Sequence, residues 1–507
     1  MPNLRAFGAN EFMESAISAG VLTELIVRGY PIAPENRCLV RRSRDEQQPR
    51  AAWFTESDSD EDSDDSEADG MARRAAAKPL EALDFCGCVG PIFVTALQTF
   101  VRNEGLLPPS LDGKLPRRVF SGLRRLGLRG VTSVPPNILS ALVLSFPRLT
   151  HLDLTGTRCT PAVLESLSTH ASNTVSDPGM RLKSLALGRC MGLTSAALAR
   201  FIIGPTYDGV ISMDDARGSL PSCPRGGVCA ELEELSLYGD KSFPTLLTEE
   251  DLYLIVSSAP CFTSNAASMT YLDLSSCPVT ARVLDRAFTN AGGARSLRSL
   301  GLSHIPSLGL SPLIEFITSR APNVEILTLV NSCISELSMT PFSGNGRVNE
   351  AALALAVRSQ LLDPICFLPF RNRSPHKNVP IDEGPTRLRV VEFSNALLNL
   401  LPPGPQPSNL SPSSTDVSAC SSSSSAWTTI RSRGGRAWYV DASACWVNGR
   451  FVRGSTSPNP LPEVRPVQEE ITMLSALGAG GHARHGSVGW HAHKMEVSSP
   501  RALAPSE

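Results

Sequence analysis

The chain has 507 residues and a formal net charge of −2, which gives no overall indication of nucleic acid or an acidic substrate as a partner. It has no uninterrupted apolar run of about 18 residues, so neither a membrane-spanning helix nor membrane binding is expected. Charged residues interrupt Met1–Ile32, which is therefore unlike a signal peptide. The 13 cysteines are scattered rather than grouped in a compact framework, which favours reduced thiols in the cytoplasm or nucleus.

The first residues already have the spacing of a leucine-containing repeat. The positions that fit are Leu22, Leu25, Val27 and Tyr30. The segment Pro2-Asn3-Leu4 resembles the lead-in to another copy, so we predict degenerate repeats over residues 1–54. Repeat arrays normally begin with a cap that has a polar outer face. Because no such cap precedes these residues, either a partner covers this end or the chain is an incomplete version of a longer one, and we favour the second interpretation.

A strongly acidic stretch follows the first repeats. Residues 55–69 carry nine carboxylates and no basic residue. Such a run of like charge opposes compaction, so we predict a disordered acidic insertion over residues 55–79. Ser57, Ser59 and Ser66 each have an acidic residue three positions later, which is typical of sites for acid-directed kinases. We therefore mark these three serines as candidate phosphorylation sites.

The centre of the chain repeats the spacing L-x-x-L-x-L eight times in one frame. The middle positions of the eight copies are Leu83, Leu126, Leu152, Leu185, Leu235, Leu272, Leu300 and Leu327. Neighbouring copies without long insertions recur within the roughly 20–29-residue period of leucine-rich units. In each copy the last two leucines alternate with polar or small residues, which predicts a short strand with one buried face.

Residues 181–205 give the clearest view of one complete unit. Leu185 and Leu187 predict a strand, Thr194 can cap a following helix, and Gly204 followed by proline favours a stop. The apolar face of such a unit has no partner inside it, so stacked neighbours must bury it. Other helix starts are predicted where a cap precedes proline, at Thr160 and Ser311, and at Thr248, which has a carboxylate three residues on.

These units resemble the cysteine-containing, ribonuclease-inhibitor-like class of leucine-rich repeats. Cys88, Cys190 and Cys277 stand at the position that gives the class its name. The resemblance covers residues 80–333 and, more weakly, residues 1–30 and 388–398. The substrate-binding halves of many F-box proteins are similar. It implies an α/β fold: a right-handed solenoid, or horseshoe, with a parallel sheet on the concave face and helices outside.

The remaining organisation follows from composition. We predict a solenoid over residues 80–398, with insertions at 102–121, 205–230 and 334–386, the last of which contains a helix at Glu350–Leu362. A proline- and serine-rich linker is predicted at 399–436. The tail, 437–507, is predicted to be partly disordered and to contain a small β-hairpin turning at Asn448-Gly449.

No motif in the sequence predicts catalysis. The sequence contains no G-x-S-x-G, H-E-x-x-H or phosphate-loop pattern, so we predict no catalytic residue and no enzyme activity. Cys223 and Cys229 lack the paired spacing of zinc ligands, and the histidines of the tail have no nearby carboxylate or thiolate in ligand register. We therefore predict neither a metal site nor a cofactor.

Function is expected on the concave face, where the side chains between the leucines point outward. The predicted partner-binding residues are Arg125, Arg129, His151, Asp153, Glu234, Tyr238, Tyr271 and Asp273. Arginine and tyrosine are enriched in protein-binding hot spots. The leading hypothesis is a non-enzymatic scaffold that binds a protein partner there. Two alternatives are a ubiquitin-ligase substrate receptor of the SCF type whose F-box is absent or truncated here, binding a ligase adaptor, and an enzyme with its site in residues 437–507.

Overall fold

The computed structural model describes the repeat region and a few strands beyond it. The described residues are 4–27, 80–107, 119–172, 180–204, 207, 227–239, 245, 247–264, 269–288, 293–332, 387–388, 390–401, 427–431, 437–441, 445–447 and 450–452. The candidate phosphorylation sites, the helix predicted at Glu350–Leu362 and the tail histidines lie outside these ranges.

Every one of the eight repeat motifs places its middle leucine at the centre of a three-residue strand. The parallel strands are β1 (Ala6–Gly8), β2 (Ala82–Asp84), β3 (Arg125–Gly127), β4 (His151–Asp153), β5 (Ser184–Ala186), β6 (Glu234–Ser236), β7 (Tyr271–Asp273), β8 (Ser299–Gly301), β9 (Ile326–Thr328) and β10 (Val390–Phe393). The strand frame predicted from the leucine spacing is therefore right at all eight positions.

Helical segments alternate with the strands. They are η1 (Glu14–Ala16), α1 (Ala19–Ile26), α4 (Pro91–Asn103), α5 (Pro136–Leu144), α6 (Pro161–Ser172), α7 (Ser195–Ile203), α9 (Glu249–Ser258), α10 (Pro260–Thr263), α11 (Ala281–Arg286), η4 (Gly293–Ser296), α12 (Leu310–Glu315), the π-helical η5 (Phe316–Arg320) and α15 (Asn395–Leu400). This alternation with a mostly parallel sheet confirms the predicted α/β class.

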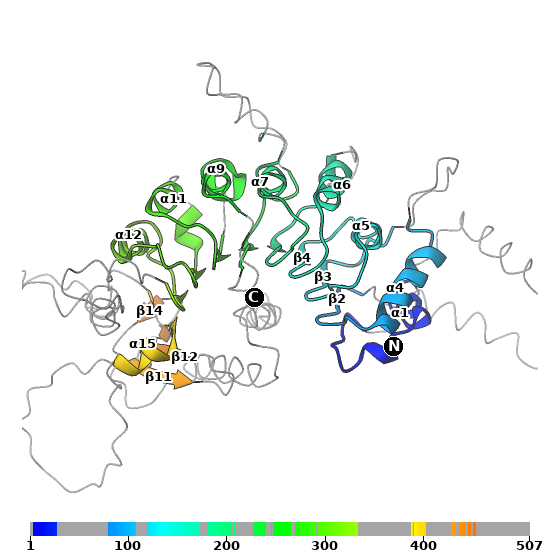
Figure 1. Cartoon of the computed structure of the whole chain (residues 1–507), viewed down its shortest axis with the longest axis horizontal. Coiled ribbons are helices and arrows are strands. Elements are labelled where there is room, and N and C mark those ends of the chain that lie inside the picture. Colours follow the sequence, from blue (N-terminus) through cyan, green and yellow to red (C-terminus); the bar gives the residue numbers. More distant parts are fainter. Residues whose placement is uncertain are drawn as a thin grey trace, which may run out of the picture. The chain divides into compact units, whose positions relative to one another are not determined.

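The chain divides into two compact units. The N-terminal unit comprises Met1–Leu193 with Gly227–Cys229, and the C-terminal unit comprises Thr194–Gly226 with Ala230–Glu507. The first contains β1 to β5 and the second contains the strands from β6 onward. Within each unit the main helices lie on one side of the strands (Figure 1).

The middle leucines of neighbouring strands pair directly. In the N-terminal unit the register joins Leu83, Leu126, Leu152 and Leu185, and in the C-terminal unit it joins Leu235, Leu272, Leu300, Leu327 and Val391. All of these side chains are at most 2% exposed. A single apolar row therefore forms the centre of the core in each unit.

The backbone turns in the same way after seven of the strands. Two residues past the third leucine or phenylalanine of the motif, the φ angle is positive, at Gly87, Gly130 and Gly156 and also at Arg189, Ser276, His304 and Asn331. Glycine adopts this conformation without strain, whereas other residues rarely do. The repeat geometry is therefore imposed even where the sequence does not favour it locally.

The cysteines at the class-naming position bind the preceding repeat. Cys190 Sγ donates to the carbonyl of Leu154 over 3.0 Å, and Cys277 Sγ donates to that of Leu237 over 3.4 Å. Ser332 occupies the same place in its repeat and donates to the Leu302 carbonyl. The thiol or hydroxyl thus bonds a backbone carbonyl of the neighbouring repeat and links the two repeats.

The predicted helix starts are confirmed at three of four sites. Helix α6 begins at Pro161, directly after Thr160. Thr194 accepts a hydrogen bond from the Ala197 backbone N–H, and Thr248 accepts one from that of Asp251. The box at Thr248 is not reciprocal, because Asp251 accepts from the Thr248 hydroxyl and the Thr248 N–H donates to Ser195. The fourth predicted start, Ser311, is wrong: α12 begins at Leu310 after Gly309.

The N-terminal repeat differs from the prediction. Leu22 lies in helix α1 rather than in a strand, because Ser18 caps the helix and Leu22 and Ile26 bury one face at a spacing of one turn. The first strand is β1, in the segment that the lead-in at Pro2-Asn3-Leu4 introduces, and it pairs in parallel with β2.

The end of the array changes direction. Strand β12 (Ala437–Asp441) pairs antiparallel with β10, and β11 (Trp427–Arg431) pairs antiparallel with β12. Strand β11 falls inside the segment predicted as a linker, since its pairing with β12 outweighs the composition of its surroundings. The predicted hairpin is confirmed by β13 (Cys445–Val447) and β14 (Arg450–Val452), joined at Asn448-Gly449.

None of the helices in the described ranges is long and apolar enough to cross a membrane.

The core assignment predicts unequal effects at two adjacent buried positions. Leu185→Ala should lower the free energy of unfolding by about 2–5 kcal/mol, because it removes buried methyl groups and leaves a cavity. Ser184→Ala should be near neutral, since the buried Ser184 hydroxyl has no hydrogen-bond partner among the described residues. Denaturant unfolding measures both; equal losses at the two positions would contradict the strand frame.

The buried thiols should be chemically inert in the folded protein. Burial raises the pKa of both Cys190 and Cys261 to about 12. At pH 8 roughly one thiol in ten thousand is then ionised, and the thiolate is the reactive form. Iodoacetamide labelling followed by peptide mass mapping should find both cysteines unmodified until guanidinium is added. Labelling of native Cys190 at the rate of a short cysteine peptide would contradict this packing.

Candidate functional site

The predicted residues of the N-terminal unit lie on adjacent strands. Arg125 on β3 pairs in register with His151 on β4, and the next partner along the sheet is Ser184. Arg125 is exposed, while His151 and Arg129 are half-buried. The His151 Nδ1 lies 2.8 Å from the Thr150 hydroxyl. The structure thus brings two positively charged groups and an imidazole to one part of the strand face.

The predicted residues of the C-terminal unit also lie on adjacent strands. Glu234 on β6 pairs in register with Tyr271 on β7, and both are half-buried. The Tyr271 hydroxyl lies 3.5 Å from Asp273 Oδ2. Tyr238, however, is buried, at 4% exposure. This leaves Glu234 and Tyr271 as the predicted binding residues of this unit with accessible surface.

The aspartates at the strand ends serve the backbone. Asp153 accepts a hydrogen bond from the N–H of Thr155, and Asp273 accepts one from that of Ser275. Both aspartates are buried. Burial raises the pKa of Asp273, and its bonds to Ser275 and Tyr271 oppose that rise. Each carboxylate therefore holds the turn that follows its strand.

The strand next to Asp273 makes room for that carboxylate. Gly301 on β8 lies beside Asp273, and a Cβ atom added there would overlap Asp273 Oδ1. Ser275 and Ser303 lie two residues after Asp273 and Gly301. The Ser275 hydroxyl accepts from the Ser303 N–H, and the Ser303 hydroxyl accepts from the Val330 N–H. These rows hold repeats together, so the first position of each strand is the row with the most accessible polar groups.

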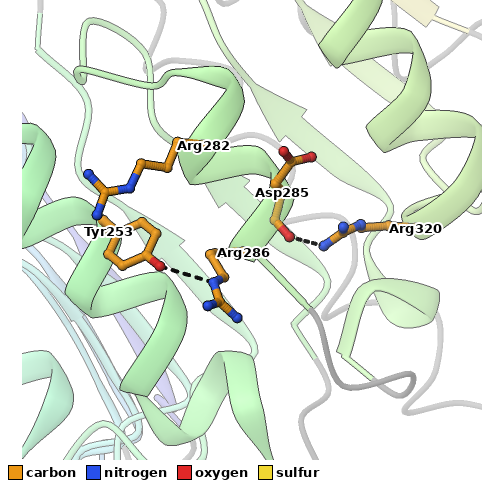
Figure 2. Close-up of a pocket in the computed structure, with 5 residues that line it drawn as sticks. All are labelled: Tyr253, Arg282, Asp285, Arg286 and Arg320. Carbon is orange, nitrogen blue, oxygen red and sulfur yellow. Dashed lines mark hydrogen bonds between the residues drawn. The ribbon is translucent and has the colours of Figure 1, made fainter.

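The sequence did not single out a pocket on the helical side of the C-terminal unit. It has a volume of about 650 Å³ and is lined by Tyr253, Arg282, Asp285, Arg286 and Arg320. Figure 2 shows these side chains, which come from α9, α11 and η5. The spacing of four between Arg282 and Arg286 was a readable signal for two cations on one helix face. Nothing local in the sequence linked them to Tyr253 or Arg320.

Tyr253 organises two of the pocket arginines. The Arg286 Nε donates to the Tyr253 hydroxyl over 3.0 Å, and the Arg282 guanidinium lies 4.2 Å from the centre of the ring. The hydrogen bond from Arg286 lowers the pKa of Tyr253. Arg320 donates to the backbone carbonyl of Asp285. The three guanidinium groups are therefore positioned by neutral acceptors and an aromatic ring.

Comparison with known proteins gives no relative: no family model matches the sequence, and no curated protein matches it either.

The buried carboxylate of Asp273 should make stability depend on pH. The raised pKa of Asp273 means that its carboxyl group binds a proton more tightly in the folded protein than in the unfolded chain. In the unfolded chain an aspartate titrates at about pH 3.9. The contribution of Asp273 to stability is therefore greatest below that value and is lost as the pH rises through the folded-state pKa. Asp273→Asn, which keeps the Oδ1 acceptor, should therefore gain stability relative to the original protein as the pH rises above about 4.

Denaturant unfolding at several pH values measures this difference. Glu315→Gln, a neutralised exposed carboxylate of the same unit, is the matched control and should show a smaller change with pH. Parallel curves for Asp273→Asn and the original protein would mean that burial does not control this carboxylate.

Proposed function

We propose that the chain is a leucine-rich-repeat protein of the ribonuclease-inhibitor-like class that binds another protein through its strand face, without catalysing a reaction. The observation that carries this proposal is that side chains at different positions of each strand have different roles. Counted from the first residue of each strand, Asp153 and Asp273 at the third position support turns, and Ser275 and Ser303 at the fifth bond neighbouring repeats. The first position presents Arg125, His151, Glu234 and Tyr271 above a fully buried leucine row. A rigid array of large polar and aromatic groups is suited to protein recognition.

The bonds of the cysteine position support the assignment to this repeat class. Cys190 and Cys277 bind a carbonyl of the preceding repeat, and Ser332 does the same with a hydroxyl. A position that links one repeat to the next explains why a small, buried donor recurs there. We further propose that the repeats form a right-handed solenoid with the sheet on its concave face.

The two strand faces favour different chemistry in a partner. In the N-terminal unit, Arg125, Arg129 and His151 favour acidic groups opposite β3 and β4. In the C-terminal unit, Glu234 favours a basic group, and Tyr271 offers an aromatic surface with a hydroxyl. The described cysteines of the repeat region, from Cys86 to Cys277, are free thiols, which agrees with a protein of the cytoplasm or nucleus.

Site-specific crosslinking tests the strand face without knowledge of the partner. A photoreactive benzoylphenylalanine in place of Arg125 or Tyr271 should capture a discrete cellular protein. The same group in place of Arg102, an exposed arginine on helix α4, should not capture it. Capture from position 102 alone would place the interface on the helices and contradict the proposal.

Titration of the captured protein then gives the energetic contribution of the row. Arg125→Ala and Tyr271→Ala should each weaken binding by about 1–3 kcal/mol, the range expected of hot-spot residues, while Arg102→Ala should have little effect. Circular dichroism must show that all three variants remain folded. Unchanged affinity for both strand variants would rule out the first-position row as the binding surface.

A further inference from the structure

We propose that the pocket between α9, α11 and η5 binds the phosphoryl group of a phosphorylated side chain on a partner protein. The pocket lies on the helical side of the C-terminal unit, so this inference concerns a second surface and does not depend on the strand-face proposal. Its lining residues are Tyr253, Arg282, Asp285, Arg286 and Arg320.

The charges of the pocket are unbalanced. Three guanidinium groups face one carboxylate, that of Asp285, which points away from Arg286 in Figure 2. Among the described residues, none of the three arginines forms an ion pair with an acidic side chain. Arg298 of the same unit, by contrast, lies 3.4 Å from Glu325. The pocket therefore has positive charge available for an anion from outside.

The hydrogen-bond donors of the pocket are also available. Tyr253 accepts from Arg286 through its oxygen, which leaves the hydroxyl proton free to donate. Arg282 lies over the ring face and also forms a hydrogen bond with Tyr253, but a guanidinium has five N–H groups, so further donors remain for a ligand. Arg320 uses Nη1 for backbone carbonyls and keeps its other nitrogens. Arginine groups together with a hydroxyl proton suit an acceptor with several oxygens.

A phosphoryl group fits this set better than a carboxylate. It carries about −1.5 to −2 charges at pH 7 and offers three acceptor oxygens, whereas a carboxylate has one charge and two oxygens. The volume of about 650 Å³ leaves room for the residues that flank the phosphorylated side chain. The pocket is therefore suited to a modified peptide rather than to a bare anion.

The surroundings of the pocket disfavour a nucleic acid. Helix α9 begins with Glu249, Glu250 and Asp251, one turn before Tyr253, and Asp285 is exposed at the pocket itself. A long polyanion would meet these carboxylates, because binding of nucleic acid depends on a continuous basic surface. A peptide with one phosphoryl group contacts the arginines without extending its charge over the acidic turn.

The test is a titration of the full-length chain with fluorescently labelled peptides. The probe is a degenerate peptide library with one fixed phosphoserine, and the same library without phosphate is the reference. Both are titrated at about 0.15 M salt, which screens non-specific attraction between charges. The phosphorylated library should bind at least tenfold more tightly. Arg282→Gln and Arg286→Gln should each weaken binding about tenfold, since each removes charge-assisted hydrogen bonds. Tyr253→Phe, which keeps the ring under Arg282, should weaken it less.

Arg295→Gln is the matched control, an exposed arginine of the same unit outside the pocket, and it should leave the affinity unchanged. Circular dichroism checks that each variant is folded. Equal binding of the two libraries would overturn the proposal, as would normal binding by folded Arg282→Gln and Arg286→Gln. Inorganic phosphate that competes at the peptide's own concentration would assign the pocket to a free anion. An oligothymidylate that binds as tightly, through the same arginines, would assign it to nucleic acid; either result would overturn a phosphopeptide site.

Discussion

The structure depends on one constraint: a three-residue strand can bury its leucine only against another strand of the same kind. Leu152 lies between Leu126 and Leu185, and all three are at most 2% exposed. The backbone has the same requirement, since the N–H of Leu154 is bonded to the carbonyl of Ala186 in the next repeat. Apolar burial and hydrogen bonding are thus satisfied by the same neighbour, and a repeat removed from the array would lose both.

This constraint also explains the polar residues inside each unit. A strand that ends after three residues exposes backbone groups at its turn, and Asp153 or Asp273 bonds to one of them. The cost is a carboxylate held away from water, which is visible in the raised pKa of Asp273. Gly301 leaves the space that this carboxylate requires. Residues that are polar and point away from the leucine row are therefore not automatically binding residues.

The parts of the fold that sequence could predict are those fixed by local chemistry. The leucine frame gave every middle strand position, and Thr194 capped its helix as expected, because both depend on a few adjacent residues. Helix α1 was misread as a strand, since a spacing of three residues suits either structure when the segment is short. The burial of Tyr238 was missed because alternation predicts which way a side chain points but not what covers it.

The pocket around Tyr253 could not be predicted from the sequence, because its residues come from helices that are far apart in the chain. Its residues occupy helices that succeed one another through the array, so the repeat itself brings them together: α11 packs beside both α9 and α12, the helix that η5 continues. The leucine row fixes the spacing of those helices, yet it places no demand on their exposed side chains. Arg282 and Arg286 are exposed and contribute no apolar burial to the stack. The ring of Tyr253 and its hydroxyl stabilise the two guanidinium groups, but their mutual repulsion remains, and the anion of the proposed phosphopeptide would relieve it.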